Sequence, residues 1–172
     1  SKYSFKFVYN SSYDVTNYIY SIYLALDELD DDLILLHGDL YFTKSTLSRM
    51  LLESKSTVVV DTTLPQPEKD FKARLHNNRV LQIATYINDV DCVACQPLYK
   101  LNKADWQVWA DAIRKFCDDG KTNVYAEEAL NTILHIIDLR CFDLKGELCM
   151  EIDTPEDLAL LKAQRKKGKT DE

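Results

Sequence analysis

Two periods of apolar and polar residues along the chain predict its secondary structure. From 16 to 29, apolar residues recur every three or four positions, which is typical of an amphipathic helix. The segments 33–37 and 57–61 are short and mostly apolar, which indicates strands buried on both faces of a parallel sheet. A strand is also predicted at 3–9, where aromatic residues partly alternate with other residues.

Turn and capping residues predict where the other elements begin and end. Thr43 can cap a helix through residue 52, Asn77 and Asn78 mark the turn of a hairpin, and Gly120 is placed to end a helix. Thr154, followed by Pro155, begins the last helix. The other predicted elements are strands at 71–75, 79–84, 90–101, 136–144 and 148–152, and helices at 103–119 and 126–135.

This alternation of strands and helices predicts an α/β fold with a layered sheet and right-handed crossovers. No internal repeat or low-complexity linker divides the chain, so residues 1–172 are expected to form one domain. The basic segment 165–172 is interpreted as a frayed, solvated tail.

Composition excludes several classes of protein. Hydrophobic residues make up 46% of the 172 residues, which excludes general disorder. The net charge of −7 argues against a nucleic-acid-binding protein and against a protein that coats an anionic membrane. These residues contain no apolar run of about 18 residues and open on no basic-then-apolar leader, so neither a transmembrane helix nor secretion is expected from them. The five cysteines, an odd number in apolar segments, predict reduced thiols in a cytoplasmic protein, and Cys92 and Cys95 are read as core residues.

Glycine is scarce, and this limits how the chain can bind phosphate. The four glycines stand alone, so neither G-x-G-x-x-G nor G-x-x-x-x-G-K-[ST] can be written from them. No glycine-rich loop that cradles phosphate is therefore present in these 172 residues.

Carboxylates follow two of the predicted strands. Asp39 comes directly after the strand at 33–37, and ligands of α/β proteins bind outside the carboxyl ends of strands. Glu151 and Asp153 lie at the end of another strand, where alternation lets both point the same way. Such carboxylates could hold Mg²⁺. A simple turn at Asp39 and a helix entry at Asp153 are the structural alternatives.

Four segments, in order, resemble the nucleotidyltransferases that act on sugar phosphates and alcohol phosphates. Residues 16–23 resemble the T-N-N-x-x-S-L segment of that family, and 33–40 resemble its strand ending in G-D. Residues 125–130 resemble Y-x-E-D-A-L, and 150–158 resemble the closing E-I-D-T-x-E-D-L. The likeness is strongest to small bacterial members that use CTP and a phosphorylated alcohol such as phosphocholine. It implies a three-layer α/β sandwich around a mostly parallel mixed sheet, without the N-terminal strands.

The resemblance also implies a reaction and a metal site. The phosphate of a phosphomonoester attacks the α-phosphate of a nucleoside triphosphate, and pyrophosphate leaves. Asp39 and Asp153 would be the catalytic residues that bind Mg²⁺, with Glu151 as a further ligand or a residue behind the ligands. The implied partners are therefore a nucleoside triphosphate and a small phosphomonoester, with neither nucleic acid nor membrane.

For the acceptor substrate, the resemblance implies contacts from Asn17, Ser21 and Glu127. A carboxylate such as Glu127 suits a cationic head group. Tyr18 and Tyr125 lie near the same crevice and could attract a quaternary ammonium by cation–π interaction, or could simply be core and rim residues.

The chain departs from the family at its start. The family's glycine-rich G-x-G-x-R/K loop and the lysine that follows it are absent from these residues. Either a preceding segment or another chain would supply them, and these residues alone are expected to be inactive. A homodimer is left open. Cys95 lies in a stretch where the family often has glycine beside the substrate, so the acceptor is not fixed.

Three other functions remain open. A sugar-1-phosphate nucleotidyltransferase would use the same site with another acceptor. A glycosyltransferase of similar fold is disfavoured because Asp39-Leu40-Tyr41 lacks the second acid of a D-x-D metal site. A non-catalytic module of the same fold would bind a protein partner and would not depend on a metal.

Overall fold

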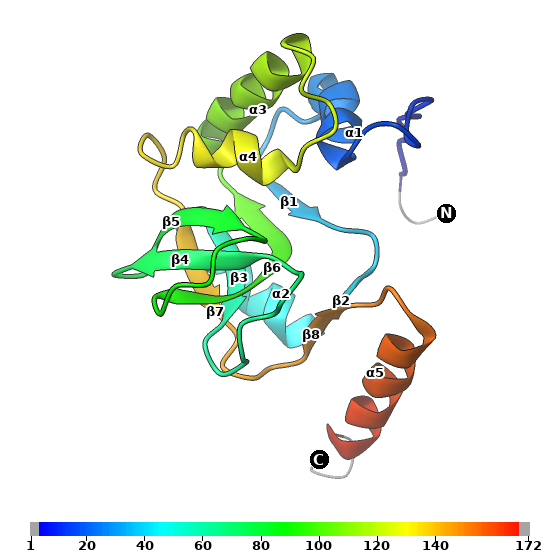
Figure 1. Ribbon diagram of the computed structural model, residues 1–172, viewed down its shortest axis with the longest axis vertical. Helices are drawn as coiled ribbons and strands as arrows, with labels where there is room; N and C mark the ends of the chain where they lie inside the picture. Colours follow the sequence, from blue (N-terminus) through cyan, green and yellow to red (C-terminus); the bar gives the residue numbers. More distant parts are fainter. Residues whose placement is uncertain (1–3, 169–172) are drawn as a thin grey trace.

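A six-stranded mixed sheet forms the centre of the computed structural model, which describes residues 4–168 (Figure 1). The strand order is β1-β6-β3-β7-β5-β4, and β6 also pairs with β4. The strands are β1 (Leu33–Leu36), β3 (Thr57–Asp61), β4 (Lys72–His76), β5 (Arg79–Ala84), β6 (Cys92–Leu101) and β7 (Arg140–Asp143). The pairings make β1, β3, β4 and β7 run in one direction and β5 and β6 in the other, which confirms the predicted mixed α/β fold.

Elements on both faces of the sheet make three layers. Helices α1 (Tyr18–Ala25), α3 (Lys103–Asp118) and α4 (Ala126–Asn131) gather on one face (Figure 1). The other face carries α2 (Lys44–Met50) and a small sheet of β2 (Leu40–Phe42) and β8 (Cys149–Glu151). A 3₁₀ turn, η1 (Leu26–Glu28), follows α1, and α5 (Pro155–Gly168) ends the described chain.

The alternation of β3 explains why both faces are covered. All five residues of this strand are buried. Val58 and Val60 pack into the large cluster beneath α1, α3 and α4, whereas Val59 packs into the cluster beneath α2. Because successive side chains point to opposite faces, a continuous apolar run needs a layer on each side.

Helix α3 holds the helical layer together through two tryptophans. Trp106 and Trp109 are buried and meet edge-on, with 6.0 Å between ring centroids and 75° between planes. The Trp106 Nε1–H donates to the Leu29 carbonyl oxygen at 2.7 Å, and the Trp109 Nε1–H donates to the Ala126 carbonyl oxygen at 3.1 Å. These bonds fix the segments before β1 and at the start of α4 relative to α3.

Several predicted turns and caps are confirmed. Asn77 and Asn78 have φ angles of 48° and 63°, as expected for a two-residue turn joining antiparallel strands. Thr43 accepts a hydrogen bond from the Thr46 N–H at the start of α2. Thr154 does the same for the Asp157 N–H at the start of α5.

One strand prediction is wrong, and one predicted strand has a different setting in the sheet. Residues 4–9 form no strand, and residue 3 lies outside the described part; Phe5, Phe7 and Tyr9 are largely exposed. No other described segment pairs with them, so their backbone N–H and C=O groups have no neighbouring strand with which to form a sheet. The strand at 33–37 exists as β1, but it is antiparallel to β6 and only half-buried, because β6 is its one pairing partner among the described residues.

Other boundaries shift by a few residues. The strand predicted at 136–144 begins only at Arg140, after a series of turns that follows the short helix α4. Helix α5 extends into the segment read as a tail, and residues 169–172 lie outside the described part. Cys92 and Cys95 are buried, as predicted. None of the helices in the described residues is long and apolar enough to cross a membrane.

Candidate functional site

The pairing of β2 with β8 brings together two carboxylates that are far apart in the sequence. Leu40 is opposite Glu151, and the Ile152 N–H donates to the Asp39 carbonyl oxygen at 3.0 Å. Asp39 is therefore held beside the end of β8. Strand β2 is too short to be visible in the hydrophobic pattern, so the sequence predicted both acids without predicting the pairing that joins them.

Asp39 and Glu151 form a compact group with His37. One potential ligand atom from each of these three residues lies within 4.8 Å of the other two. The His37 Nδ1 is 3.1 Å from the Glu151 Oε1, and about a quarter of each of these two side chains is exposed. Two of the three predicted metal ligands are thus brought together. Oxygen atoms of two carboxylates are a donor set that fits Mg²⁺.

Asp153 lies outside this group. Its side chain is exposed, and its backbone N–H donates to the Asp157 Oδ2 at 3.2 Å. It is two residues beyond Glu151, between β8 and α5, so its predicted role as a ligand stays a prediction.

Neighbouring acids change the proton affinity of His37. Burial acts to lower its pKa, but the hydrogen bond to Glu151 and the charges of Glu127, Glu151 and Asp39 outweigh burial. The net result is a pKa above the usual value for histidine. The group therefore has a strongly negative environment in which a positive charge is favoured.

A pocket of about 470 Å³ opens beside this group. His37, Asp39 and three predicted substrate residues, Tyr18, Ser21 and Glu127, line it together with apolar residues of α1 and β1. Ser21 accepts a hydrogen bond from the Asn10 Nδ2 at 3.1 Å. The pocket thus joins Asp39, one of the three predicted metal ligands, to three of the five predicted substrate residues.

Asn17 and Tyr125 do not line this pocket. Asn17 caps α1, and its Oδ1 accepts from the Tyr18 N–H at 2.7 Å. The Tyr125 ring is 6.3 Å from the Tyr18 ring and 5.0 Å from the Phe71 ring, centroid to centroid. Tyr125 lines a smaller cavity of about 140 Å³, which Glu127 also lines.

Glu127 is a buried carboxylate between the two cavities. Only 1% of it is exposed, and it accepts hydrogen bonds from the Tyr18 hydroxyl and, at 2.6 Å, from the Tyr99 hydroxyl. Burial raises the pKa of its carboxyl, although both tyrosine hydroxyls act in the opposite direction. Tyr99 was missed in the sequence because it lies in an apolar strand, where an aromatic residue predicts only core packing.

The raised pKa of Glu127 predicts a pH-dependent stability. The folded protein binds more protons than the unfolded chain between the unfolded pKa, about 4.3, and the higher folded pKa. Stability is therefore lost as pH rises through this window. The substitution Glu127→Gln removes the buried charge and leaves a partner for both tyrosine hydroxyls. We expect its urea midpoint, relative to wild type, to rise with pH across the window.

The matched control is the exposed neighbour Glu128. Glu128→Gln should leave the difference in urea midpoint from wild type almost independent of pH, because this side chain is solvated. An equal pH trend in both variants would contradict the assignment of the effect to the buried carboxylate.

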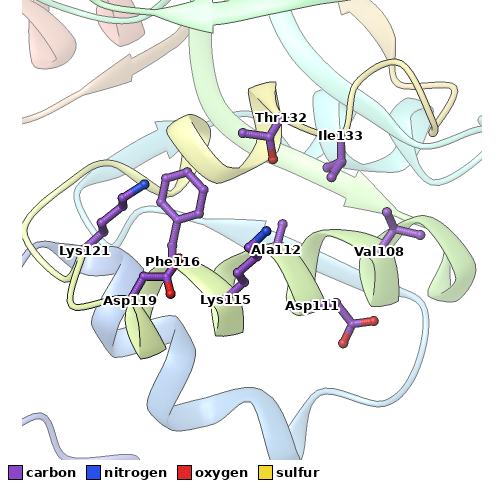
Figure 2. Close-up of a pocket in the computed structure, with 9 residues that line it drawn as sticks. All are labelled: Val108, Asp111, Ala112, Lys115, Phe116, Asp119, Lys121, Thr132 and Ile133. Carbon is purple, nitrogen blue, oxygen red and sulfur yellow. The ribbon is translucent and has the colours of Figure 1, made fainter.

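A larger cavity, of about 700 Å³, lies on the helical layer (Figure 2). One face of α3 lines it together with Lys121, Thr132 and Ile133, and the Lys121 Nζ is 4.8 Å from the centre of the Phe116 ring. None of the predicted site residues lines this cavity. The residues with a predicted chemical role that line either cavity therefore all lie at the pocket of about 470 Å³ beside Asp39 and not at this larger cavity.

Comparisons with known proteins show the same fold in enzymes of one kind. The chain matches no protein-family model and no curated protein. The inositol-1-phosphate CTP transferase from T. maritima matches 86% of this chain and 60% of its own, with a TM-score of 0.65 and 21% identity. The CTP:phosphocholine cytidylyltransferase from Streptococcus pneumoniae matches 90% of this chain and 66% of its own, with a TM-score of 0.67 and 18% identity.

A third structure, the nucleoside-diphosphate-sugar pyrophosphorylase from Vibrio cholerae, matches 82% of this chain and 62% of its own. Its TM-score is 0.54 and its identity is 15%. The chain therefore spans less than two thirds of the length of each of these structures. At such identities the likeness is one of fold, and the chain has the mixed α/β fold found in these nucleotidyltransferases.

Proposed function

We propose that the chain is the larger part of a Mg²⁺-dependent nucleotidyltransferase. It transfers a nucleoside monophosphate, CMP from CTP, to a phosphorylated small alcohol such as phosphocholine and releases pyrophosphate. The observation that carries this proposal is the β2–β8 pairing, which holds Asp39 beside Glu151 at a pocket that contains the buried Glu127. Two of the structures with this fold are named as CTP-using transferases, which supports CTP.

In this proposal the acids at the end of β8 serve the transfer of the nucleotide. Asp39 and Asp153 hold Mg²⁺, and Glu151 is a further ligand or supports them. Bound there, Mg²⁺ would neutralise negative charge on the reacting phosphates. The chain itself positions the acceptor phosphate in line with the α-phosphate and lowers the barrier mainly by orientation.

The pocket beside these acids receives the acceptor. The Glu127 carboxyl accepts a hydrogen bond from the Tyr18 hydroxyl, and the Tyr125 ring lies 6.3 Å from the Tyr18 ring, centroid to centroid. A cationic head group is attracted both by a carboxylate and by aromatic faces. Ser21, in the middle of α1, also lines the pocket, and an acceptor contact from Asn17, which caps α1, stays a prediction.

A sugar-1-phosphate nucleotidyltransferase is the second candidate. The observation in its favour is the fold shared with the nucleoside-diphosphate-sugar pyrophosphorylase. The buried carboxylate distinguishes the two, because a neutral sugar does not compensate the charge of Glu127 and a trimethylammonium group does.

A substrate panel tests the proposal. The natural polypeptide that contains this chain is assayed for Mg²⁺-dependent pyrophosphate release with CTP, UTP or GTP, each with phosphocholine or with a sugar 1-phosphate. We expect the highest kcat/KM with CTP and phosphocholine. Faster release with UTP or GTP and a sugar phosphate would favour the second candidate, and no release with any pair would refute nucleotidyl transfer.

A further inference from the structure

Tyr99 has no role in the function proposed so far, although its hydroxyl donates to the buried Glu127 carboxylate and its side chain lines the same pocket. The residue is held from several sides. It pairs with Leu35 of β1 and with Val58 of β3, so its backbone lies in the interior of the sheet. Its ring packs edge-on against the Trp109 ring, with 5.3 Å between centroids and 61° between planes. The hydroxyl therefore has a fixed place at the pocket.

The hydrogen bonds to Glu127 come from hydroxyls and not from a basic side chain, although buried carboxylates are normally paired with a cation. Its Oε1 accepts from the Tyr99 hydroxyl at 2.6 Å, and its Oε2 accepts from the Tyr18 hydroxyl. Among the described residues, no lysine, arginine or histidine forms an ion pair with it. The charge of His37 acts on it, but the His37 ring is hydrogen-bonded to Glu151.

Hydroxyl donors stabilise a carboxylate without neutralising it. Burial raises the pKa of the Glu127 carboxyl, and both tyrosine hydroxyls act to lower it, because a hydrogen bond to an ionised group is stronger than one to a neutral group. A lysine or arginine in their place would cancel the charge. The apolar walls of the pocket, which include Ile22 and Leu35, screen this charge less than water does. A cation in the pocket would therefore meet an uncompensated carboxylate.

We propose that Tyr99 is a positioning residue for the acceptor: it orients the Glu127 carboxylate and keeps it ionised, so that the pocket selects a phosphomonoester with a cationic head group over an uncharged one of the same shape. The inference rests on the proposed function only for the placement of the acceptor in this pocket. Tyr18 donates to the other oxygen, but its ring also packs against His37, so Tyr99 gives the cleaner test.

A purely structural role of the Tyr99 hydroxyl is the simpler alternative. Buried polar groups are normally hydrogen-bonded, and a hydroxyl that only satisfied the Glu127 carboxyl would need no ligand to explain it. In that case removal of the hydroxyl would lower stability and would change the binding of charged and uncharged acceptors by the same factor. The two roles therefore differ in ligand selectivity, which a stability measurement does not report.

Two acceptors of the same shape measure this selectivity. In 3,3-dimethylbutyl phosphate a carbon atom replaces the nitrogen of phosphocholine, so only phosphocholine carries a positive charge. Calorimetry of the natural polypeptide that contains this chain measures both dissociation constants. Mg²⁺ and a CTP analogue with a methylene bridge between its α- and β-phosphates are present, so that no turnover occurs. We expect wild type to prefer phosphocholine at least about 10-fold, and Tyr99→Phe to lose most of this preference through weaker phosphocholine binding.

Tyr23→Phe is the matched control, because the Tyr23 hydroxyl also donates to a carboxylate, that of Asp118, at 2.9 Å, but lies outside the pocket. It should keep the wild-type preference. A double-mutant cycle shows whether Tyr99 acts through Glu127. Glu127→Gln should itself abolish the preference, and Tyr99→Phe added to it should change the ratio of the two dissociation constants by less than about twofold.

The inference would be overturned if Tyr99→Phe kept the wild-type preference, if Tyr23→Phe lost it to the same extent, or if wild type bound both acceptors equally or bound neither. Tyr99→Phe keeps the ring that packs on Trp109, and its urea midpoint reports any loss of stability separately. None of these readouts requires turnover. A preference for phosphocholine without pyrophosphate release in the substrate panel would refute the proposed transfer and leave the role of Tyr99 standing.

Discussion

Asp39→Ala is expected to lower kcat for pyrophosphate release at least about 10³-fold while the protein stays folded. The side chain is exposed, so its removal costs little stability. The contact that ties this turn to β8 is made by the Asp39 backbone oxygen, which the alanine variant keeps. The loss therefore reports on the carboxylate itself. Steady-state kinetics with CTP and phosphocholine, together with the urea midpoint, measures both effects.

Asp14→Ala is the matched control for this variant, because Asp14 is also an exposed aspartate and lies shortly before α1. It should keep the kcat of wild type. If Asp39→Ala retained more than about a tenth of wild-type kcat, a value far above that expected on loss of a metal ligand, Asp39 would have no catalytic role.

Trp109→Ala is expected to give the largest loss of stability, about 3–5 kcal/mol. The indole is completely buried and packs edge-on against the Tyr99 ring, with 5.3 Å between centroids. Its Nε1–H also donates to the Ala126 carbonyl oxygen next to Glu127. The substitution therefore leaves a cavity and releases the start of α4. Urea unfolding followed by far-UV circular dichroism measures the loss.

Trp109→Phe separates packing from the hydrogen bond. It keeps an aromatic ring in the core, and we expect a smaller loss than for alanine. Lys115→Ala, at an exposed position of the same helix, should change stability by less than about 0.5 kcal/mol. Equal stability of Trp109→Ala and wild type would show that α3 does not anchor the helical layer through this residue.

Local patterns predicted most of the fold because most elements are specified by their own residues. The apolar run of β3, the turn at Asn77 and Asn78, and the cap at Thr154 each act within a few positions. The failures involve pairing between distant segments. Residues 4–9 carry the alternation of a strand but have no partner strand, and β2 exists because β8 lies beside it.

In the candidate site, too, features set by neighbouring residues were predictable and those set by pairing between distant segments were not. Strand ends pointed to Asp39 and Glu151, and the fold places them in one group. His37 was passed over because a histidine at the end of an apolar run looks like a strand residue, and only the pairing of β2 with β8 sets it against Glu151. Its position directly before Gly38-Asp39 was the available signal. The role of the exposed Asp153 as a metal ligand stays a prediction.

In the proposed function, a metal ion and a nucleotide phosphate meet at Asp39. Anomalous diffraction from crystals grown with CDP-choline and with Mn²⁺, which replaces Mg²⁺ at oxygen ligands, can locate both. We expect an anomalous peak bonded to the Asp39 carboxylate, with the diphosphate of the nucleotide beside it and the choline group near Glu127. Nucleotide bound elsewhere, or no Mn²⁺ peak at Asp39, would refute this metal site.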